Sequence, residues 1–330
     1  KSKGLKWNIF SVTGAVLTVV GILFWINISF IGVGTASESS IPSIAVLPFE
    51  NKGSTEDDFY AYGISSDLIS DVTSTGVIRV AGLNDIEKLD YASMSYDDIA
   101  DKLLVRYVAK GTLWKMDTMF QLSMELFDTK NDKVVWSNRW QTAWRDLATI
   151  KDDLSINILE NLNIIITKNI EQVNMASNPE AYEYYLKGQY KFEKRVTLED
   201  LMVARGFYQK AIDLDSTLIT AMIKLAKTFQ YTNEFDTYIE LSRKALNKAK
   251  KIGDKTNQAY AYMGIGTAHY FRDGDIDKAQ EYYLKGDEIA QEVGDKVLQT
   301  YFLNNLAITY TSKGEIDKAI DTMKTNLEFH

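Results

Sequence analysis

The chain has no cysteine and almost no histidine, and both gaps restrict its chemistry. Of its 330 residues none is Cys and only two are His, at His269 and His330. Disulfides, thiolate nucleophiles and Cys-ligated metals are therefore excluded. A His-based catalytic triad and a metal site with several His ligands are disfavoured for the same reason. We predict no catalytic residues, no cofactor and no metal site.

Basic residues are also too few for a nucleic-acid surface. The chain carries 37 Lys and Arg against 45 Asp and Glu, a net charge of −8. Without Lys1, Lys3 and Lys6, which precede the first apolar run, the balance is 34 against 45, or −11. Nucleic acid is bound by clustered Lys and Arg, so we expect no nucleic-acid partner. The length and an apolar content of 45% leave room for two soluble domains.

Formal charge is missing altogether near the amino terminus. The 31 residues between Lys6 and Glu38 carry none, and residues 9–28 are mainly apolar. A helix needs about 20 such residues to cross a hydrocarbon core. We predict a cytoplasmic stub and transmembrane anchor over residues 1–36, with residues 9–31 in the lipid bilayer. Because the flanking basic residues all precede the span, the rest of the chain is expected on the periplasmic side of the inner membrane.

A cleaved signal peptide is the alternative reading of this segment, since Gly34 and Ala36 are small residues of the kind found at cleavage sites. The apolar run is longer than the roughly 7–15 residues of a secretory signal, which favours a retained anchor. Gly14, Thr18 and Gly21 fall on one helical face and would let two anchors pack closely, so a homodimer is a further prediction.

Residues 43–172 alternate between strand and helix patterns. Short apolar runs bounded by turn residues predict strands, and apolar residues at helical spacing predict helices. The predicted strands are 43–49, 77–81, 107–116, 120–127 and 134–141, and the predicted helices are 57–74, one that begins after Ser95, and 145–168. The order β-α-β-α-β-β-β-α indicates a mixed α/β sheet with helices packed on it.

Five blocks of this segment, in order, carry a resemblance to a known family. They are Ser43-Ile-Ala-Val-Leu-Pro-Phe-Glu-Asn51, Phe59-Tyr-Ala-Tyr-Gly-Ile64, Ile99-Ala-Asp-Lys-Leu-Leu-Val-Arg-Tyr-Val-Ala-Lys-Gly-Thr112, Gln121-Leu-Ser-Met-Glu-Leu-Phe-Asp128 with Val135-Trp136, and Trp140 to Ile150. Together they resemble the TolB-like amino-terminal domain of bacterial membrane-anchored proteins, which is related to the periplasmic part of CadC-type regulators. The resemblance implies a recognition or sensing module and no enzyme. Tyr62 stands where relatives carry an acidic residue, so no recognition role of that acidic group is implied here.

Two motifs recur in the C-terminal half with a period of 40–41 residues. Gly274-Asp-Ile-Asp-Lys-Ala279 returns as Gly314-Glu-Ile-Asp-Lys-Ala319, and Ile252-Gly-Asp-Lys255 returns as Val293-Gly-Asp-Lys296. Such a period predicts stacked helix pairs that bury their apolar faces against their neighbours. The last repeat has five marks of a tetratricopeptide repeat at the usual spacing, namely Leu306, Ala307, Tyr310, Gly314 and Ala319. We predict an all-α tetratricopeptide solenoid of about four repeats over residues 178–330.

Several polar or aromatic clusters fit structural roles better than sites. Asp273-Gly-Asp-Ile-Asp277 lacks the Gly and Glu that complete a calcium loop, and it predicts an inter-helix turn. Trp136, Trp140 and Trp144 predict core and rim packing rather than a ligand shelf. Carboxylates at helix starts are favoured by the helix dipole, and three clusters are assigned to this role: Glu56-Asp-Asp58, Asp97-Asp98 and Asp152-Asp153. The tyrosines Tyr182, Tyr184, Tyr185 and Tyr190 either line a peptide groove or fill helix crossings.

The candidate peptide-binding residues are Tyr301, Asn304, Asn305 and Ile308, on the first helix of the last repeat. Our leading hypothesis is a membrane-anchored, extracytoplasmic scaffold or sensor that binds a protein or peptide and performs no catalysis. The alternative, taken from proteins that this chain resembles, is the sensory half of a signalling protein. Its output domain would precede the membrane span and would be a class III adenylate or guanylate cyclase, a serine/threonine kinase or a winged-helix regulator.

Overall fold

The structure is a computed structural model that describes residues 42–162, 164 and 178–327. The predicted anchor at residues 9–31 and the predicted domain boundary at residue 172 lie outside these ranges. Within the part of the chain that is described, no helix has both the length and the apolar character needed to span a bilayer.

The first described segment folds as a mixed α/β sheet domain. Its elements are β1 (Ser43–Val46), β2 (Glu50–Asn51), the 3-10 turn η1 (Thr55–Asp57), α2 (Asp58–Ser74), β3 (Arg79–Val80), α3 (Leu83–Glu87), α4 (Tyr96–Leu103), β4 (Tyr107–Met116), β5 (Met119–Asp128), η2 (Thr129–Asn131), β6 (Lys133–Ala143), η3 (Trp144–Asp146) and α5 (Leu147–Asn161). The strand order is β3-β1-β4-β5-β6, with β2 also paired to β4. β1 runs parallel to β3 and β4, whereas β4, β5 and β6 are antiparallel. The prediction of a mixed α/β sheet is confirmed.

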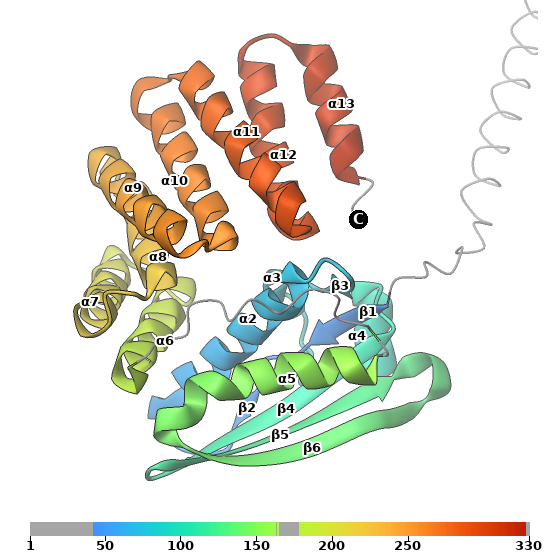
Figure 1. The fold of residues 1–330 in the computed structure, drawn as a ribbon. Coiled ribbons are helices and arrows are strands. Elements are labelled where there is room, and N and C mark those ends of the chain that lie inside the picture. The colour runs from blue at the N-terminus through green and yellow to red at the C-terminus, as the bar shows by residue number, and fades with distance from the viewer. Residues whose placement is uncertain (1–41, 163, 165–177, 328–330) are drawn as a thin grey trace, which may run out of the picture. The chain divides into compact units, whose positions relative to one another are not determined.

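The core of this domain lies between the sheet and two helices. Figure 1 shows α2 and α5 over the same face of the sheet. Alternate residues of β5 are buried, as expected for a strand with one covered face. The buried side chains come from all three elements and include Phe120, Leu122 and Met124 of β5, Ile64 and Leu68 of α2, and Leu154 and Ile158 of α5. Trp136 and Trp140 of β6 lie 5.7 Å apart and pack against this core with Trp144, in keeping with the predicted packing role.

Three local predictions need correction. No element was predicted between the strand at 43–49 and the helix at 57–74, but this segment contains β2, because Lys52 N–H donates to the carbonyl of Leu113 at 2.8 Å and adds the segment to the sheet. The short helix α3 was not predicted. The last helix ends at Asn161 and not near residue 168, since a wide turn closes it, with Ile164 N–H donating to the carbonyl of Leu159 at 2.9 Å.

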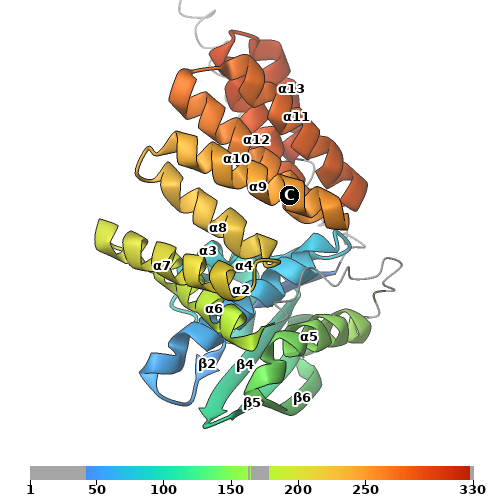
Figure 2. The same ribbon diagram turned by 60° about the vertical axis from the view of Figure 1, so that its left-hand side comes forward.

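The second described segment consists of helices only. They are α6 (Pro179–Glu193), α7 (Leu198–Leu214), α8 (Ile219–Gln230), α9 (Phe235–Ile252), α10 (Lys255–Asp273), α11 (Ile276–Val293), α12 (Lys296–Ser312) and α13 (Ile316–Leu327). Successive helices pack on each other, and two views show the pairs stacked in chain order (Figures 1 and 2). The predicted all-α repeat array is confirmed. We call α6, α8, α10 and α12 the first helices of the pairs.

The repeated Gly-Asp-Lys motif is the junction between one pair and the next. Gly253 and Gly294 end α9 and α11 in the left-handed region, with φ of 78° and 72°. The next residues, Asp254 and Asp295, cap the following helices, each accepting a hydrogen bond at 2.9 Å from a backbone N–H three residues on. Glycine adopts the left-handed conformation without strain, and an aspartate satisfies a free N–H of the new helix. The motif that recurs after 41 residues therefore ends one helix and begins the next.

Asp128, at the end of β5, is a buried anchor of the sheet domain. Its side chain is 3% exposed and accepts hydrogen bonds from Arg106 Nε at 2.9 Å, Arg106 Nη2 at 2.8 Å and Asn131 Nδ2 at 2.6 Å. The bonds from Arg106 hold the pKa of Asp128 below its ordinary value, although burial acts in the opposite direction.

We predict that Asp128→Ala lowers the free energy of unfolding by about 2–3 kcal/mol at pH 7, because the charge-assisted hydrogen bonds that the buried carboxylate accepts from Arg106 and Asn131 are lost. Since the folded pKa is depressed, this contribution is complete above the unfolded-state pKa of about 3.9 and is lost as pH falls through the folded value. Urea unfolding at pH 7 and pH 3 measures the difference, with the exposed Asp101→Ala as the control. An undiminished difference at the lower pH would contradict the assignment.

Candidate functional site

The four first helices place equivalent side chains on one face of the array. The reference point is the small residue at the helix crossing, which is Gly188 in α6, Ala226 in α8, Gly266 in α10 and Ala307 in α12. In each helix we take three residues, which lie six positions before, three positions before and one position after this small residue. Together these residues are called the first-helix face. In chain order they are Tyr182, Tyr185 and Gln189; Thr220, Ile223 and Lys227; Tyr260, Met263 and Thr267; and Tyr301, Asn304 and Ile308. Neighbouring first helices contact each other along this layer, for example through Asn257 Nδ2 and Thr220 Oγ1 at 3.4 Å.

In α6 all three of these positions bind the chain's own helix α2. Tyr182 donates to Asp67 Oδ2 at 2.9 Å, and Tyr185 donates to Asp67 Oδ1 at 3.2 Å. Gln189 Nε2 donates to Ser66 Oγ at 3.1 Å. Burial raises the pKa of both tyrosines well above the ordinary value, with a further contribution from Asp67, so they remain protonated donors. The first repeat therefore holds one carboxylate with neutral donors.

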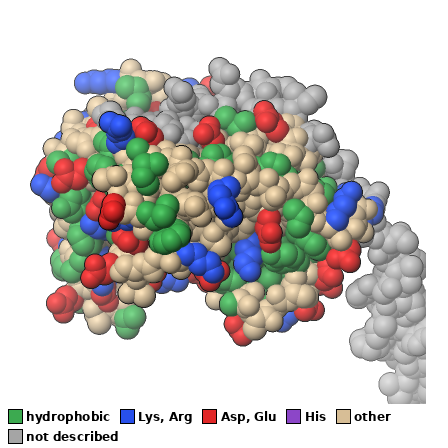
Figure 3. Space-filling view, turned by 90° about the horizontal axis from the view of Figure 1, so that it is seen from below, with side chains coloured by type: hydrophobic (Ala, Val, Ile, Leu, Met, Phe, Trp, Pro, Cys, Tyr) green, Lys and Arg blue, Asp and Glu red, His purple; other side chains and the backbone are tan. Residues whose placement is uncertain are grey.

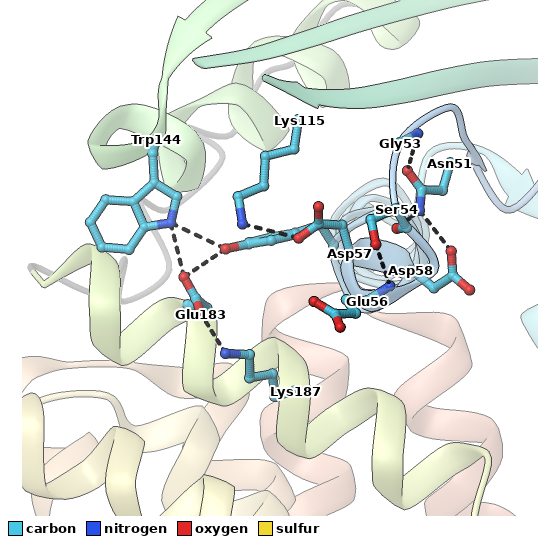
Figure 4. Close-up of polar contacts among 11 residues, drawn as sticks. Asn51, Gly53, Ser54, Glu56, Asp57, Asp58, Lys115, Trp144, Glu183 and Lys187 are labelled. Atoms are coloured by element: carbon cyan, nitrogen blue, oxygen red, sulfur yellow. Dashed lines mark hydrogen bonds and ion pairs between the residues drawn. The ribbon is translucent and has the colours of Figure 1, made fainter. Parts of the chain in front are cut away.

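A second polar cluster joins the same two helices near the start of α2 (Figure 4). Glu183 of α6 accepts from Tyr60 of α2 at 2.6 Å, from the Trp144 indole at 3.0 Å and from Lys187 at 2.6 Å. Burial alone would raise the pKa of Glu183, but the bonds from Lys187, Tyr60 and Trp144 outweigh it and lower the pKa. A carboxylate held in its ionised form by three donors is an anchor and a poor general acid.

Apolar packing between the two clusters makes the junction a single core. Gly63 of α2 faces Leu186 of α6, and a Cβ built at Gly63 would lie 3.2 Å from the Cβ of Leu186. One cluster of buried side chains runs without a break from the sheet domain through α6 and α7 to Leu225 of α8. A second contact lies at the far end of α2, where a Cβ at Gly76 would clash with the carbonyl of Gly294. The sheet domain thus contacts the array both at α6 and at the turn before α12.

The predicted peptide-binding residues all lie on α12. Tyr301 is 49% exposed and Ile308 is 50% exposed. Asn304 accepts a hydrogen bond from Asn326 of α13 at 2.8 Å, and Asn305 donates to the carbonyl of Tyr301 at 3.0 Å. Both amides therefore make bonds within the array, while the two larger side chains face outward. Their role in binding a peptide stays a prediction.

Sequence reasoning missed the junction residues. The sequence predicts that Tyr182 and Tyr185 line a peptide groove or fill helix crossings, and the structure places their hydroxyls on Asp67 of α2. No sequence pattern indicated a role for Asp67 or Glu183, because each binds a partner more than a hundred positions away in the chain. The sequence contained one signal. Tyr182, Tyr185 and Gln189 stand at the same distances along the chain from Gly188 as Tyr301, Asn304 and Ile308 stand from Ala307.

The other polar clusters are engaged in local structure. Ser95 accepts a hydrogen bond from Asp98 N–H at 3.1 Å at the start of α4, as its pattern predicts. Asp273 to Asp277 lies at the turn between α10 and α11, as predicted. Asp152-Asp153 was wrongly placed at a helix start, since α5 begins at Leu147. Among the described residues, no group of three His, Asp or Glu side chains is arranged to hold a metal ion.

One hollow of about 530 Å³ lies on the sheet over β4, β5 and β6. Its lining includes Lys110, Glu125 and Arg139, so it mixes both signs of charge. The hydroxyls of Thr112 and Ser123 bond each other at 2.7 Å, and Glu125 accepts from Tyr96 at 2.5 Å. Thr112, Ser123 and Glu125 are thus already hydrogen-bonded, which makes the hollow a weaker candidate site than the first-helix face.

Comparison with known proteins gives partial matches. No family model matches the chain. Putative adenylate cyclase 3 of Rhizobium meliloti (strain 1021) is 24% identical over 189 residues, which are 56% of this chain and 32% of that protein. Photosystem I assembly protein Ycf3 of Prochlorococcus marinus subsp. pastoris is 31% identical over 96 residues, which are 29% of this chain and 53% of that protein. The chain thus spans about a third of the first relative and about half of the second.

Solved structures match parts of the fold. BtubC from P. vanneervenii covers 55% of this chain and 72% of its own, at a TM-score of 0.40 and 16% identity. TolB from Acinetobacter baumannii covers 37% of this chain and 28% of its own, at a TM-score of 0.30 and 14% identity. Membership of the TolB-like family stays a prediction, whereas the α/β sheet domain followed by tetratricopeptide-like helical repeats is the observed arrangement.

We predict that Asp67→Ala lowers the free energy of unfolding by about 2–4 kcal/mol, because the buried hydroxyls of Tyr182 and Tyr185 lose their shared acceptor. Asp67→Asn keeps an acceptor oxygen and should lose less. Urea unfolding measures both variants, and the exposed Glu160→Ala should stay within about 0.5 kcal/mol of wild type. A loss for Asp67→Ala no larger than that of the control would show that these bonds do not hold the junction.

Proposed function

We propose that this chain is a non-catalytic module that binds a protein or peptide on the first-helix face of its array. The observation that carries the proposal is the use of this face within the chain. Tyr182, Tyr185 and Gln189 bind α2 in the first pair, and the equivalent residues of the fourth pair include the outward-facing Tyr301 and Ile308. A surface that binds a helix in one repeat is suited to bind a segment of a partner in another. Stacked repeats commonly bind partners along such extended faces.

We further propose that residues 9–31 anchor the chain in the inner membrane and that the sheet domain and array lie outside the cytoplasm. Support comes from the uncharged stretch between Lys6 and Glu38 and from the basic residues that precede it. The firm junction between α2 and α6 fits a module that positions a partner, since both parts would move as one body.

The second candidate function is the sensory part of a signalling protein. One observation favours it specifically, namely the similarity to putative adenylate cyclase 3, of which the matched stretch is 32%. In that case, binding at the array would regulate an output domain elsewhere in the same polypeptide. The coding sequence upstream of Lys1 distinguishes the two candidates, because a cyclase, kinase or winged-helix domain encoded there would exclude the plain scaffold.

A photoreactive amino acid at position 308 tests the binding face. We expect Ile308 replaced in this way to crosslink a partner protein in native cells. The control is position 284 on α11, where Leu284 is 47% exposed against 50% for Ile308 but lies on a second helix. Equal crosslinking at both positions, or a product at position 284 alone, would contradict the assignment of the face.

Protease treatment of intact spheroplasts tests the location. We expect external protease to remove the part of the chain after residue 37 while a cytoplasmic marker stays intact, because the anchor would hold that part outside. Full protection of the sheet domain and array in sealed spheroplasts would overturn the proposed topology.

A further inference from the structure

The first helices α8, α10 and α12 are depleted of acidic residues. The chain has 45 Asp and Glu and a net charge of −8, yet α8 and α12 contain none and α10 has only Asp273, its last residue. Elsewhere the charges are mixed. Figure 3 shows acidic and basic side chains interspersed on the part of the lower face formed by the described residues. The electrostatic character of the first helices therefore differs from that of the whole molecule.

Two lysines of α8 add positive charge beside the junction. Lys227 is a first-helix-face residue, equivalent to Gln189 of α6 and Ile308 of α12. It is exposed and lies 5.9 Å from the centre of the Phe192 ring. Lys224 is half-buried one turn earlier. Neither lysine forms an ion pair with a described residue, whereas Lys187, Lys194 and Lys255 of neighbouring helices all do.

Acidic groups near these lysines offset only part of this charge. Burial and the neighbouring Lys227 lower the pKa of Lys224, and the carboxylates of Glu193 and Asp67 oppose this shift only in part. Asp67 already accepts hydrogen bonds from Tyr182 and Tyr185. An incoming carboxylate would share Lys224 with these two groups, so the more exposed Lys227 is expected to contribute most.

The segment that this face binds within the chain is itself acidic. Helix α2 carries Asp58, Asp67 and Asp71 and has no Lys or Arg. The carboxylate of Asp67 is held by Tyr182 and Tyr185 of α6. Gln189, the position equivalent to Lys227 and Ile308 further along the array, also donates to Asp67, at the longer distance of 3.4 Å. In its first repeat, the first-helix face therefore binds a carboxylate of the chain itself.

We propose that the first-helix face of α8, α10 and α12 binds an acidic peptide segment of a partner protein. This inference rests on the proposed function and specifies the partner. Carboxylates of the segment pair with Lys227 and Lys224, and its apolar side chains contact Tyr301 and Ile308. The opposite charges attract the segment, and their contribution decreases with salt because both partners are partly exposed.

A labelled peptide with the sequence of residues 64–74 tests the proposal on the full chain, because it carries Asp67 and Asp71 of α2. The matched probe has Asn at both places. We expect the acidic peptide to bind roughly 2- to 30-fold more tightly than the Asn form, which is the range that two partly exposed ion pairs imply. Fluorescence anisotropy at two salt concentrations measures both affinities.

Variants of the protein locate the site. Lys227→Glu should weaken binding of the acidic peptide by about tenfold, and Lys224→Gln gives a second test that avoids burying a new carboxylate. Lys244→Glu is the matched control, since Lys244 is an exposed lysine on the second helix α9. Unfolding measurements confirm that each variant is folded.

Equal binding of the two peptides, or an equal loss in Lys244→Glu and Lys227→Glu, would overturn the inference. Tighter binding of a single-stranded oligonucleotide of matched charge, lost in Lys227→Glu, would do the same by assigning the lysines to another polyanion. If the peptide fails but position 308 still crosslinks a partner, the proposed function stands and only the acidic specificity is wrong.

Discussion

The architecture depends on one half-buried carboxylate, Asp67, and the helix that carries it. α2 is buried along most of its length because one side packs on the sheet and the other on α6. A helix enclosed on two sides must satisfy any polar group that it buries. Two tyrosine hydroxyls and a glutamine amide do so here, and Glu183 receives Tyr60 in the same way at the start of the helix. These bonds fix the register between the sheet domain and the first repeat, while apolar contacts such as Gly63 against Leu186 supply the burial.

This constraint gives the array two kinds of repeat. Stacked repeats share one geometry, so the residues around each crossing project in the same manner from pair to pair. In the first pair these residues bind α2, whereas in later pairs they are threonine, isoleucine, lysine, tyrosine, methionine or asparagine side chains that make no such bonds to α2. The sheet domain therefore covers the start of the array and leaves Lys227, Tyr301 and Ile308 exposed further along it. Its second contact, between Gly76 and Gly294, places the sheet domain beside the turn that introduces α12.

Local sequence patterns predicted most helices and strands correctly. The features that depend on contacts between residues far apart in the sequence were not predicted. The strand pattern of residues 107–116 matches β4 in both bounds, and the capping pattern at Ser95 matches the start of α4. The Gly-Asp-Lys echo predicted the repeat period because its residues act locally, as helix stop and start. β2 escaped prediction because its two residues are strand only through pairing with β4. The contacts of Asp67 and Glu183 were not predicted for the same reason, since residues more than a hundred positions apart give no periodic signal in the sequence.

The central claim is that α2 and α6 form one permanent junction, and the absence of cysteine makes it directly measurable. A Cβ at Gly63 would lie 3.2 Å from that of Leu186, close to the roughly 3.5–4.5 Å found in disulfides. The double variant Gly63→Cys and Leu186→Cys should therefore form an intramolecular disulfide under mild oxidation, detected by mass spectrometry after proteolysis. Quantitative formation of this bond supports the account. Two free thiols in a folded, oxidised sample would contradict it.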